Sequence, residues 1–460
     1  MPTAPRRIPA GRPWIALALA LAPARAQAEP PPPVPNASPN LDLAQPVPKA
    51  SPELDLAGPL TIDRAVAVAL ANNPGLRAAH HRVRSQMLLA EAERKPAGPS
   101  LSLDLWQVPL ARPYALDQSP MVMLALRQPI PPAGSLKRRA AARGHLADAE
   151  SADRDVRAQA LATAVRHAFI DYAAATARHQ LHLDHQAVSA RVLELAQARQ
   201  TVSGTLLDIA RAETEAARAH AAVATDQTTI DAARTRLNSL LARPPHAPLG
   251  PPVALPDETT TADAADLIPR ARDQRPEHRA AASRRDAAAM ELQAARREAN
   301  LPAADVGLAF FPATKVMTYN GYGVLVNLSL PWLSGQGRKR RDAQAELAAA
   351  ASADLEQADL EVASEVAGAL QAAQSAARRW VVLRQRALPA SQRAREVALS
   401  GYEVGRADML AMLAAEGTYV DIVVELIDVK SELDHALADL DRASGTRIAR
   451  SPLPTTAVQP

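Results

Sequence analysis

The stretch LTIDRAVAVALANNPGLRAA at residues 60–79 decides the fold, because a related stretch returns about 200 residues later. Its counterpart is DLIPRARDQRPEHRAA at 266–281, where Pro276 takes the place of Pro74. A glycine followed by basic residues also occurs in both copies, at Gly134, Lys137, Arg138 and Arg139 and again at Gly335, Arg338, Lys339 and Arg340. A chain that repeats one plan in this way is predicted to be a pseudo-symmetric wall segment, and such walls usually enclose something.

The composition favours long helices packed close together over thick aromatic cores. Alanine is abundant in the 460-residue chain, whereas aromatic residues make up only 3%. Small alanine side chains let helix axes approach one another, so coiled-coil packing is expected. The formal net charge is only +3, and basic residues are interleaved with acidic ones. No clustered basic face of the kind that binds nucleic acid is predicted.

The N-terminus has the parts of an export signal. Arg6, Arg7 and Arg12 precede an apolar run from Trp14 to Leu21, and small residues that suit cleavage follow. Residues 1–28 are therefore predicted to be a signal peptide, with a buried N-terminal helix as the alternative. The chain has no cysteine, and no later segment holds about 20 uninterrupted apolar residues. The periplasm, the cell exterior and an outer membrane remain as expected locations.

The rest of the chain divides into an arm, two repeats, a linker and a tail. The predicted boundaries are a Pro-rich arm at 29–59, a first repeat at 60–242, a linker at 243–262, a second repeat at 263–445 and a disordered tail at 446–460. Each repeat is expected to hold helices, a β-hairpin at about 100–130 or 303–331, and a long helical hairpin that turns at 203–205 or 404–405. Pro389 should kink the second long helix.

The hairpins alternate apolar and polar residues. In the clearest strand, 322–330, Val324 and Val326 point one way and Asn327 points the other. Strands of about nine or ten residues with one apolar face fit a transmembrane β-barrel with lipid outside and a polar lumen. A half-buried sheet in a soluble protein is the alternative explanation.

The aromatic residues favour the barrel. Of the 13 aromatic residues, seven lie in the two hairpin regions. Trp106, Tyr322 and Trp332 are candidates for the interfacial girdle of a barrel. Four strands cannot close a membrane barrel, and open edges inside lipid would leave backbone groups unpaired. Several chains are therefore expected to pool their strands.

This order of elements resembles the TolC-type outer-membrane efflux channels over residues 60–445. The matching motifs are ALANNPGLRAA at 69–79, RPEHRAA at 275–281 and GYEVGRADMLAMLAAE at 401–416. The resemblance implies a mostly helical homotrimer, in which four strands per chain build a twelve-stranded barrel that a long periplasmic α-barrel continues. The run LRQPIPPAGSLKRR at 126–139 is similar to the heavy-metal (CzcC-like) branch of that family.

The resemblance further implies a channel in the outer membrane, not an enzyme, and a passive exit duct of a tripartite efflux pump without a cofactor. Metal cations or small toxic compounds would pass from the periplasm to the outside. A periplasmic adaptor would dock at the helical turns around Gly204 and Gly405, and an inner-membrane transporter, expected to be of the RND type, would supply the energy. The alternatives are a type I secretion duct, a periplasmic adaptor and a coiled-coil scaffold.

Candidate gate residues follow from the same resemblance. Tyr402 matches a family tyrosine that helps to hold the periplasmic entrance closed, and Asp208 would be its partner acid. Two carboxylates that ring the aperture in the best-known member are replaced here by Ala411 and Ala414. The acidic residues nearby that could take their place are Asp408 and Glu416.

Two other motifs have plain explanations. His179, His182 and His185 lie three residues apart on a predicted helix and could bind a transition metal weakly, but a solvated polar face explains them equally well. The segment GQGRK at 335–339 lacks the glycine spacing and the trailing Ser or Thr of a phosphate loop. Because the sequence also has no catalytic motif, no catalytic, cofactor-binding or metal site is predicted.

Overall fold

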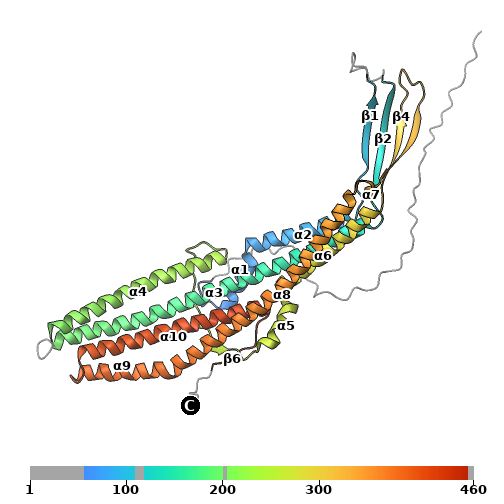
Figure 1. Cartoon of the computed structure of the whole chain (residues 1–460). Coiled ribbons are helices and arrows are strands. Elements are labelled where there is room, and N and C mark those ends of the chain that lie inside the picture. Colours follow the sequence, from blue (N-terminus) through green and yellow to red (C-terminus); the bar gives the residue numbers. More distant parts are fainter. Residues whose placement is uncertain (1–55, 109–118, 200–204, 454–460) are drawn as a thin grey trace, which may run out of the picture. The chain divides into compact units, whose positions relative to one another are not determined.

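The first repeat contains, in its described part, four helices and two strands. The computed structural model describes residues 56–108, 119–199 and 205–453, so the expected signal peptide and most of the Pro-rich arm lie outside the described residues. The elements of this repeat are α1 (Ile62–Asn72), α2 (Pro74–Glu93), β1 (Ser100–Trp106), β2 (Met121–Ile130), α3 (Ser135–Arg199) and α4 (Leu206–Leu240), as labelled in Figure 1.

The second repeat follows the same plan with small additions. Its elements are α5 (Ala264–Gln274), α6 (Pro276–Asn300), β4 (Ala303–Phe311), β5 (Gly321–Ser329), α7 (Pro331–Ser334), α8 (Gln336–Val382), the π-helical turn η2 (Leu383–Ala387), α9 (Leu388–Glu403) and α10 (Met409–Ser444). Two short strands flank it, β3 (Glu258–Thr259) and β6 (Ser451–Pro452). Within the described ranges, none of the helices combines the length and the apolar character that crossing a bilayer requires.

The break near the start of each repeat has a local cause. Asn73 stands between α1 and α2 in an extended conformation, and its Oδ1 accepts hydrogen bonds from the next two free N–H groups at 2.8 and 3.2 Å. Pro74 then begins α2, where its missing N–H would have no helical partner in any case. In the second copy Arg275 and Pro276 take these positions, and Arg275 provides no side-chain cap. The sequence repeat is thus also a repeat of helix boundaries.

The four long strands form one antiparallel sheet that joins the two repeats. Its order is β1-β2-β4-β5, and Leu126 of β2 lies opposite Leu308 of β4. The helices keep this order, because α3 packs against α2 and α6, and α6 packs against α8. Sheet and helices therefore form one continuous layer, which Figure 1 shows as strands passing into helices.

Pro389 interrupts the second long helix. α8 ends at Val382, the π-helical turn η2 follows, and α9 begins with Leu388 and Pro389. Proline has no N–H for the helical hydrogen bond, and its ring crowds the carbonyl four residues earlier, so a wider turn relieves both problems. The interruption expected at Pro389 is confirmed. The matching helix of the first repeat, α3, has no internal proline and continues for 65 residues.

The largest core cluster lies between α3 and α4. Phe169 and Tyr172 of α3 are fully buried against Leu237 at the end of α4. The Tyr172 hydroxyl donates a hydrogen bond to the carbonyl of Gly250 at 3.1 Å. The linker after α4 is therefore held against the first repeat.

Gly250→Ala is expected to destabilise the protein. The Gly250 N–H donates to the carbonyl of Leu56 at 2.7 Å, and a Cβ at position 250 would lie 2.0 Å from the carbonyl oxygen of Gly58. Because backbone cannot yield as a side chain does, we expect a loss of about 1–3 kcal/mol, measured as a lower melting temperature. Gly58→Ala is the matched control, since its Cβ would meet nothing within 4 Å. Equal melting temperatures for the two variants would contradict this packing.

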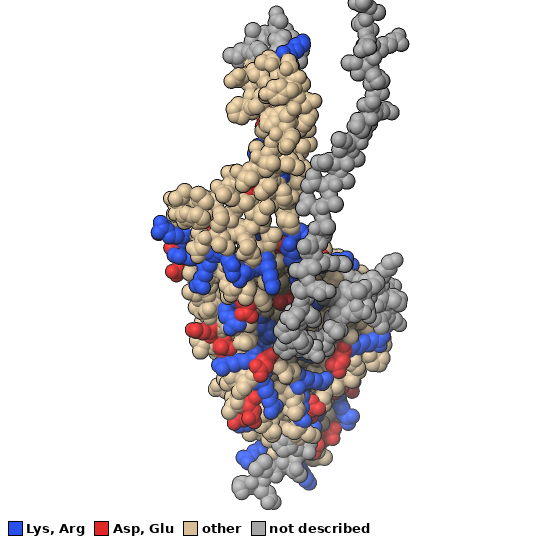
Figure 2. Space-filling view, turned by 90° about the vertical axis from the view of Figure 1, so that its right-hand side faces the viewer, with Lys and Arg blue, Asp and Glu red and all other residues tan. Residues whose placement is uncertain are grey.

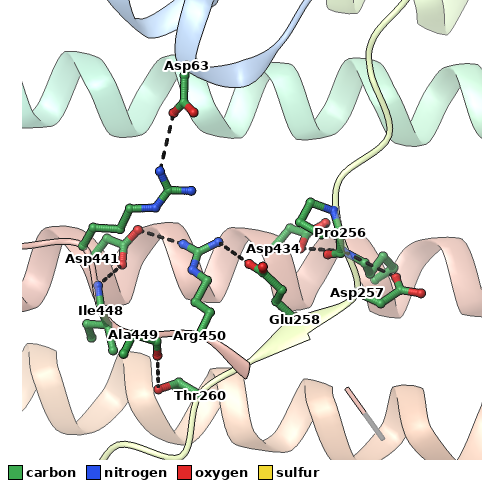
Figure 3. Close-up of polar contacts among 12 residues, drawn as sticks. Asp63, Pro256, Asp257, Glu258, Thr260, Asp434, Asp441, Ile448, Ala449 and Arg450 are labelled. Atoms are coloured by element: carbon green, nitrogen blue, oxygen red, sulfur yellow. Dashed lines mark hydrogen bonds and ion pairs between the residues drawn. The ribbon is translucent and has the colours of Figure 1, made fainter. Parts of the chain in front are cut away.

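The tail expected to be disordered from residue 446 is ordered as far as residue 453. β6 pairs with β3 of the linker, and the Ile448 N–H donates to Asp441 of α10 at 2.9 Å. Arg450 lies 2.8 Å from Asp441 and 3.9 Å from Glu258, as Figure 3 shows. The prediction was wrong for residues 446–453 because β6 pairs with a strand of the distant linker, and because the contacts of Ile448 and Arg450 with Asp441 leave no periodic pattern in the segment itself.

Candidate functional site

One face of the sheet is apolar and exposed along its whole length. The large apolar side chains on this face are Leu101, Leu103, Leu105, Leu124, Leu126, Val306, Leu308, Phe310, Val324, Val326 and Leu328. Registers such as Leu308 opposite Val324 keep them on one side. Exposing so large an apolar surface to water is unfavourable, so this face is suited to contact with lipid. The predicted alternation is confirmed.

The opposite face carries polar side chains and small ones. Asp104 and Arg127 lie on it and approach to 3.9 Å, and Asn327 lies opposite Asp305. Leu325, the residue that breaks the alternation in β5, packs on this face against a small cluster of Met123, Ala125 and Ala309. Its apolar side chain is therefore covered within the chain.

The three girdle candidates do not share one position. Tyr322, at 89% exposure, lies on the apolar face near the start of β5, and Trp332, at 44%, lies on α7 beyond its other end. These two fit girdles at opposite interfaces. Trp106 ends β1 opposite Met121, and strand alternation places it on the face of Asp104. For Trp106 the prediction of a lipid-facing girdle residue is not supported, because its place at a strand end did not reveal its face.

At the end away from the sheet, the long helices α9 and α10 are joined by a turn. Gly405 follows α9 with a φ of +79°, a left-handed conformation that suits glycine. Asp408 then caps α10, its Oδ1 accepting a hydrogen bond from the N–H of Ala411 at 2.6 Å. Gly204, the corresponding candidate of the first repeat, lies outside the described residues.

Tyr402 contacts the end of α3. It is buried near the end of α9, and the guanidinium of Arg199 lies 4.8 Å from its ring centre. Arg199 also donates to the backbone carbonyl of Tyr402 at 2.8 Å. Burial raises the pKa of the Tyr402 hydroxyl; Arg199 opposes this rise, and the nearby Asp208 carboxylate adds to it. The two helical hairpins are thus joined here by an arginine that the sequence did not single out.

Asp208 has a local partner. Its Oδ2 accepts hydrogen bonds from the N–H and the hydroxyl of Thr205 at 3.3 and 2.8 Å, and the two residues form a capping box at the start of α4. In the described part of one chain, no hydrogen bond joins Asp208 to Tyr402. The sequence Thr205-x-x-Asp208 could have indicated this role, since an acid three residues after an N-cap threonine is the signature of such a box.

A buried charge cluster joins four helices above these turns. Glu416 of α10 accepts from Nε of Arg395 on α9 at 2.6 Å, and its other oxygen lies 3.1 Å from Nδ1 of His185 on α3. Nε2 of His185 lies 3.3 Å from Glu215 on α4. Both Glu416 and His185 are less than 10% exposed. We call these four residues the four-helix charge cluster.

The pKa values of His185 and Glu416 shift in the directions that keep both residues charged. The hydrogen bond with Glu416 raises the pKa of His185, against the opposing effect of burial. Burial by itself would raise the pKa of Glu416, but His185 and Arg395 together lower it. An ionised Glu416 between two cations stabilises the contact of α10 with α3 and α9.

The structure does not place an acidic ring at the two alanine positions. Ala411 and Ala414 are exposed on α10. Glu416 is enclosed in the four-helix charge cluster, so the expectation that it could take their place is wrong. The Asp408 carboxylate caps α10, and the residue is exposed.

His179, His182 and His185 of α3 do not converge on one site. His182 lies 2.6 Å from Asp226 on α4, whereas His185 belongs to the four-helix charge cluster. Across the described ranges, no group of three or more His, Cys, Asp or Glu side chains is arranged to hold a metal ion. Ion pairing explains the positions of His182 and His185.

Solved structures share this fold. The outer-membrane channel OprN superposes with a TM-score of 0.69 at 22% identity, covering 84% of this chain and 89% of that one. VceC of Vibrio cholerae gives 0.70 at 19% identity, with 84% and 96% covered. CmeC of Campylobacter jejuni gives 0.70 at 13% identity, with 90% and 94% covered. A search of curated protein sequences gave no match.

The expected fold class is confirmed: a mostly helical chain with four long strands, in which the sheet does not close within one chain, as a barrel shared by three chains requires. The sequence profile of the outer membrane efflux protein family matches residues 65–243 and 267–446, which make up most of the two repeats. This family and the structures just compared are channels and not enzymes. The chain therefore belongs to the outer membrane efflux protein family and resides in the outer membrane, with a large helical portion in the periplasm.

Proposed function

We propose that the protein is the homotrimeric exit duct of a tripartite efflux pump, through which substrates pass passively from the periplasm to the outside. The observation that carries this proposal is a sheet with an exposed apolar face and, among the described strands, a free edge at β1 and at β5. Lipid does not tolerate unpaired backbone groups, so β5 of one chain must pair with β1 of the next. Three copies of a four-stranded sheet pass the minimum of about eight strands.

The helices supply the periplasmic part of the duct. α3, with its 65 residues, reaches about 100 Å, and it starts directly below the sheet. The end of α3, the start of α4 and the turn at Gly405 lie at the far ends of the helices. We place the docking of a periplasmic adaptor there, with Gly405 and Gly204, the latter outside the described residues, as the expected docking turns. An inner-membrane transporter of the RND type would supply the energy. Metal cations or small toxic compounds are the proposed substrates, and the heavy-metal branch remains a prediction.

Deletion of the gene and complementation test this function. The deletion strain should become sensitive to divalent transition metals, to small organic toxins, or to both, and the full chain should restore resistance. Outer-membrane fractions should contain a trimer that dissociates on heating before electrophoresis. Unchanged resistance together with loss of a secreted protein would instead support the type I secretion duct. Recovery of the chain in the soluble periplasmic fraction without detergent would end the proposal.

We also propose that the helix ends hold the periplasmic entrance closed. Tyr402 is joined to Arg199 within a chain, and the Asp208 and Asp408 carboxylates lie at the starts of α4 and α10 near the same turns. The resemblance suggests that the Tyr402 hydroxyl meets an acid at the closed entrance. We propose Asp208 as this acid, because its carboxylate already lies near Tyr402 within the chain.

Tyr402→Phe combined with Arg199→Gln should raise the conductance of single channels in planar bilayers. The two changes remove a hydroxyl and a guanidinium contact that together contribute about 2 kcal/mol. The ratio of open to closed channels should therefore rise by up to about thirty-fold, without loss of the trimer. Arg218→Gln is the control, since among the described residues Arg218 pairs with Glu215 of its own helix, at 3.8 Å, and its side chain is 76% exposed. Wild-type conductance in the double variant, with normal insertion, would show that other residues close the entrance.

A further inference from the structure

Basic residues gather where the sheet passes into the helices. The end of α2, the start of α3, the end of α6 and the start of α8 meet there, at residues 93–95, 137–139, 296–298 and 338–342. These windows hold eleven basic and three acidic residues. We call the basic residues the junction belt: Arg94, Lys95, Lys137, Arg138, Arg139, Arg296, Arg297, Arg338, Lys339, Arg340 and Arg341. On the face shown in Figure 2, blue basic side chains gather below the largely tan sheet.

Much of the junction belt is exposed and lacks an acidic partner. Arg139 pairs with Glu298 at 2.7 Å, and Arg341 pairs with its neighbour Asp342 at 2.6 Å. Arg338, Lys339 and Arg340 are all exposed, and none of the ion pairs among the described residues involves them. Their positive charge is therefore available to an external anion.

Apolar side chains lie next to the belt on the side of the sheet. Leu333 and Trp332 of α7 are 76% and 44% exposed, only a few residues before Arg338. Beyond them begins the apolar face of the strands. This order, an apolar surface, then an exposed tryptophan, then basic residues, matches the order of acyl chains, interface and headgroups at the edge of a membrane.

A groove at the same level lies between the basic residues of the junction belt and the apolar side chains next to them. It has a volume of about 750 Å³ and opens between the ends of α2, α3, α6 and α8. Its lining combines basic and apolar side chains, among them Lys95, Arg139, Arg340, Leu89, Leu136 and Leu330, with two glutamates, Glu93 and Glu298, of which Glu298 is paired with Arg139. Lys95 and Arg340 have no carboxylate partner among the described ion pairs, so the groove offers free cations beside an apolar wall.

The proposed trimer brings further basic residues together at the junction belt, and this part of the inference rests on the proposed function. When β5 of one chain pairs with β1 of the next, the start of α8 comes near the end of the neighbouring α2. Residues 338–341 then approach Arg94 and Lys95 of that neighbour. Like charges brought together in this way repel each other unless anions lie between them.

We propose that the junction belt binds the anionic headgroups of phospholipids in the periplasmic leaflet. The groove holds the phosphate beside Lys95 and Arg340 and an acyl chain along its leucines. Each basic residue close to an anionic membrane surface adds to the attraction, and salt weakens it.

The test compares two lipids on the purified full-length trimer in a neutral detergent. Phosphatidylglycerol and phosphatidylcholine with identical acyl chains are titrated, and bound lipid is counted by native mass spectrometry. Arg338→Gln, Lys339→Gln and Arg340→Gln together should weaken the binding of phosphatidylglycerol about tenfold at low salt and leave phosphatidylcholine unchanged. Arg338→Lys with Arg340→Lys should keep the wild-type preference.

The matched control removes three equally exposed arginines far from the sheet, by Arg384→Gln, Arg386→Gln and Arg393→Gln. This control should bind phosphatidylglycerol as the wild type does. Equal binding of both lipids by the wild type, or an equal loss in belt and control variants, would overturn the proposal. Gel electrophoresis of unheated samples checks the trimer separately. Should the belt variant fail to assemble, 0.5 M salt (roughly a 4 Å screening length) must abolish the preference of the wild type, and its persistence would also overturn the proposal.

Discussion

Val326→Arg should prevent most of the protein from assembling in the outer membrane. Val326 lies on the apolar face of β5 and is 63% exposed in the single chain. An arginine there would face the acyl chains near the middle of the strand, at a cost of about 2–4 kcal/mol in each chain of the trimer. The amount of heat-dissociable trimer in outer-membrane fractions measures the effect.

Asn327→Arg is the matched control for this prediction. The side chain at 327 points to the opposite face, where position 327 lies across from Asp305. An arginine there can reach a carboxylate and the water of the lumen, so assembly should stay close to that of the wild type. If both variants lose the trimer equally, the assignment of the two faces is wrong.

Glu416→Gln should cause the largest loss of stability among single changes in the helices. The substitution keeps the shape of the side chain but leaves His185 and Arg395 without their shared anion. Removing one partner of a buried ion pair costs about 3–5 kcal/mol of stability. We expect a loss at the lower end of this range, because the Arg395 side chain is 27% exposed. The melting temperature should fall, and amide exchange should rise in α9 and α10.

The effect of Glu416→Gln should depend on pH. His185 has a raised pKa, so its contribution is fully present below its ordinary value of 6.5 and is lost as the pH rises through the raised value. Glu416 has a lowered pKa, so its contribution is present above its ordinary value of 4.5 and is lost at more acidic pH. The difference in melting temperature between Glu416→Gln and the wild type should be greatest between pH 4.5 and pH 6.5. It should become smaller at higher pH, where His185 loses its charge.

Glu403→Gln provides the comparison for this cluster. Glu403 pairs with Arg191 at 3.3 Å, and the Arg191 side chain is 69% exposed, so water screens the pair. Its loss should cost less than about 1 kcal/mol. Comparable melting temperatures for Glu403→Gln and Glu416→Gln would mean that burial does not strengthen the four-helix charge cluster.

The sequence could predict those features that depend on neighbours along the chain. Asn73 and Pro74 mark a helix boundary through their own backbone preferences, and Pro389 interrupts a helix because it lacks an N–H. The alternation around Val326 defines two strand faces, since successive side chains point to opposite sides. The capping box of Thr205 and Asp208 belongs to the same class, because an acid three residues after an N-cap threonine can be recognised from the sequence.

Tertiary structure alone decided the features that join distant segments. His185 and Glu416 are 231 residues apart, and only the packing of α3 against α10 brings them together. The pairing of β6 with β3 and the contact of Arg199 with Tyr402 arise in the same way. Local sequence patterns fix which residues share a face of a helix or strand, but the register between two packed elements depends on the whole fold. The sequence by itself therefore determined the duplicated plan and the lipid-facing strands, whereas the packing of separate helices decided which charges are buried together.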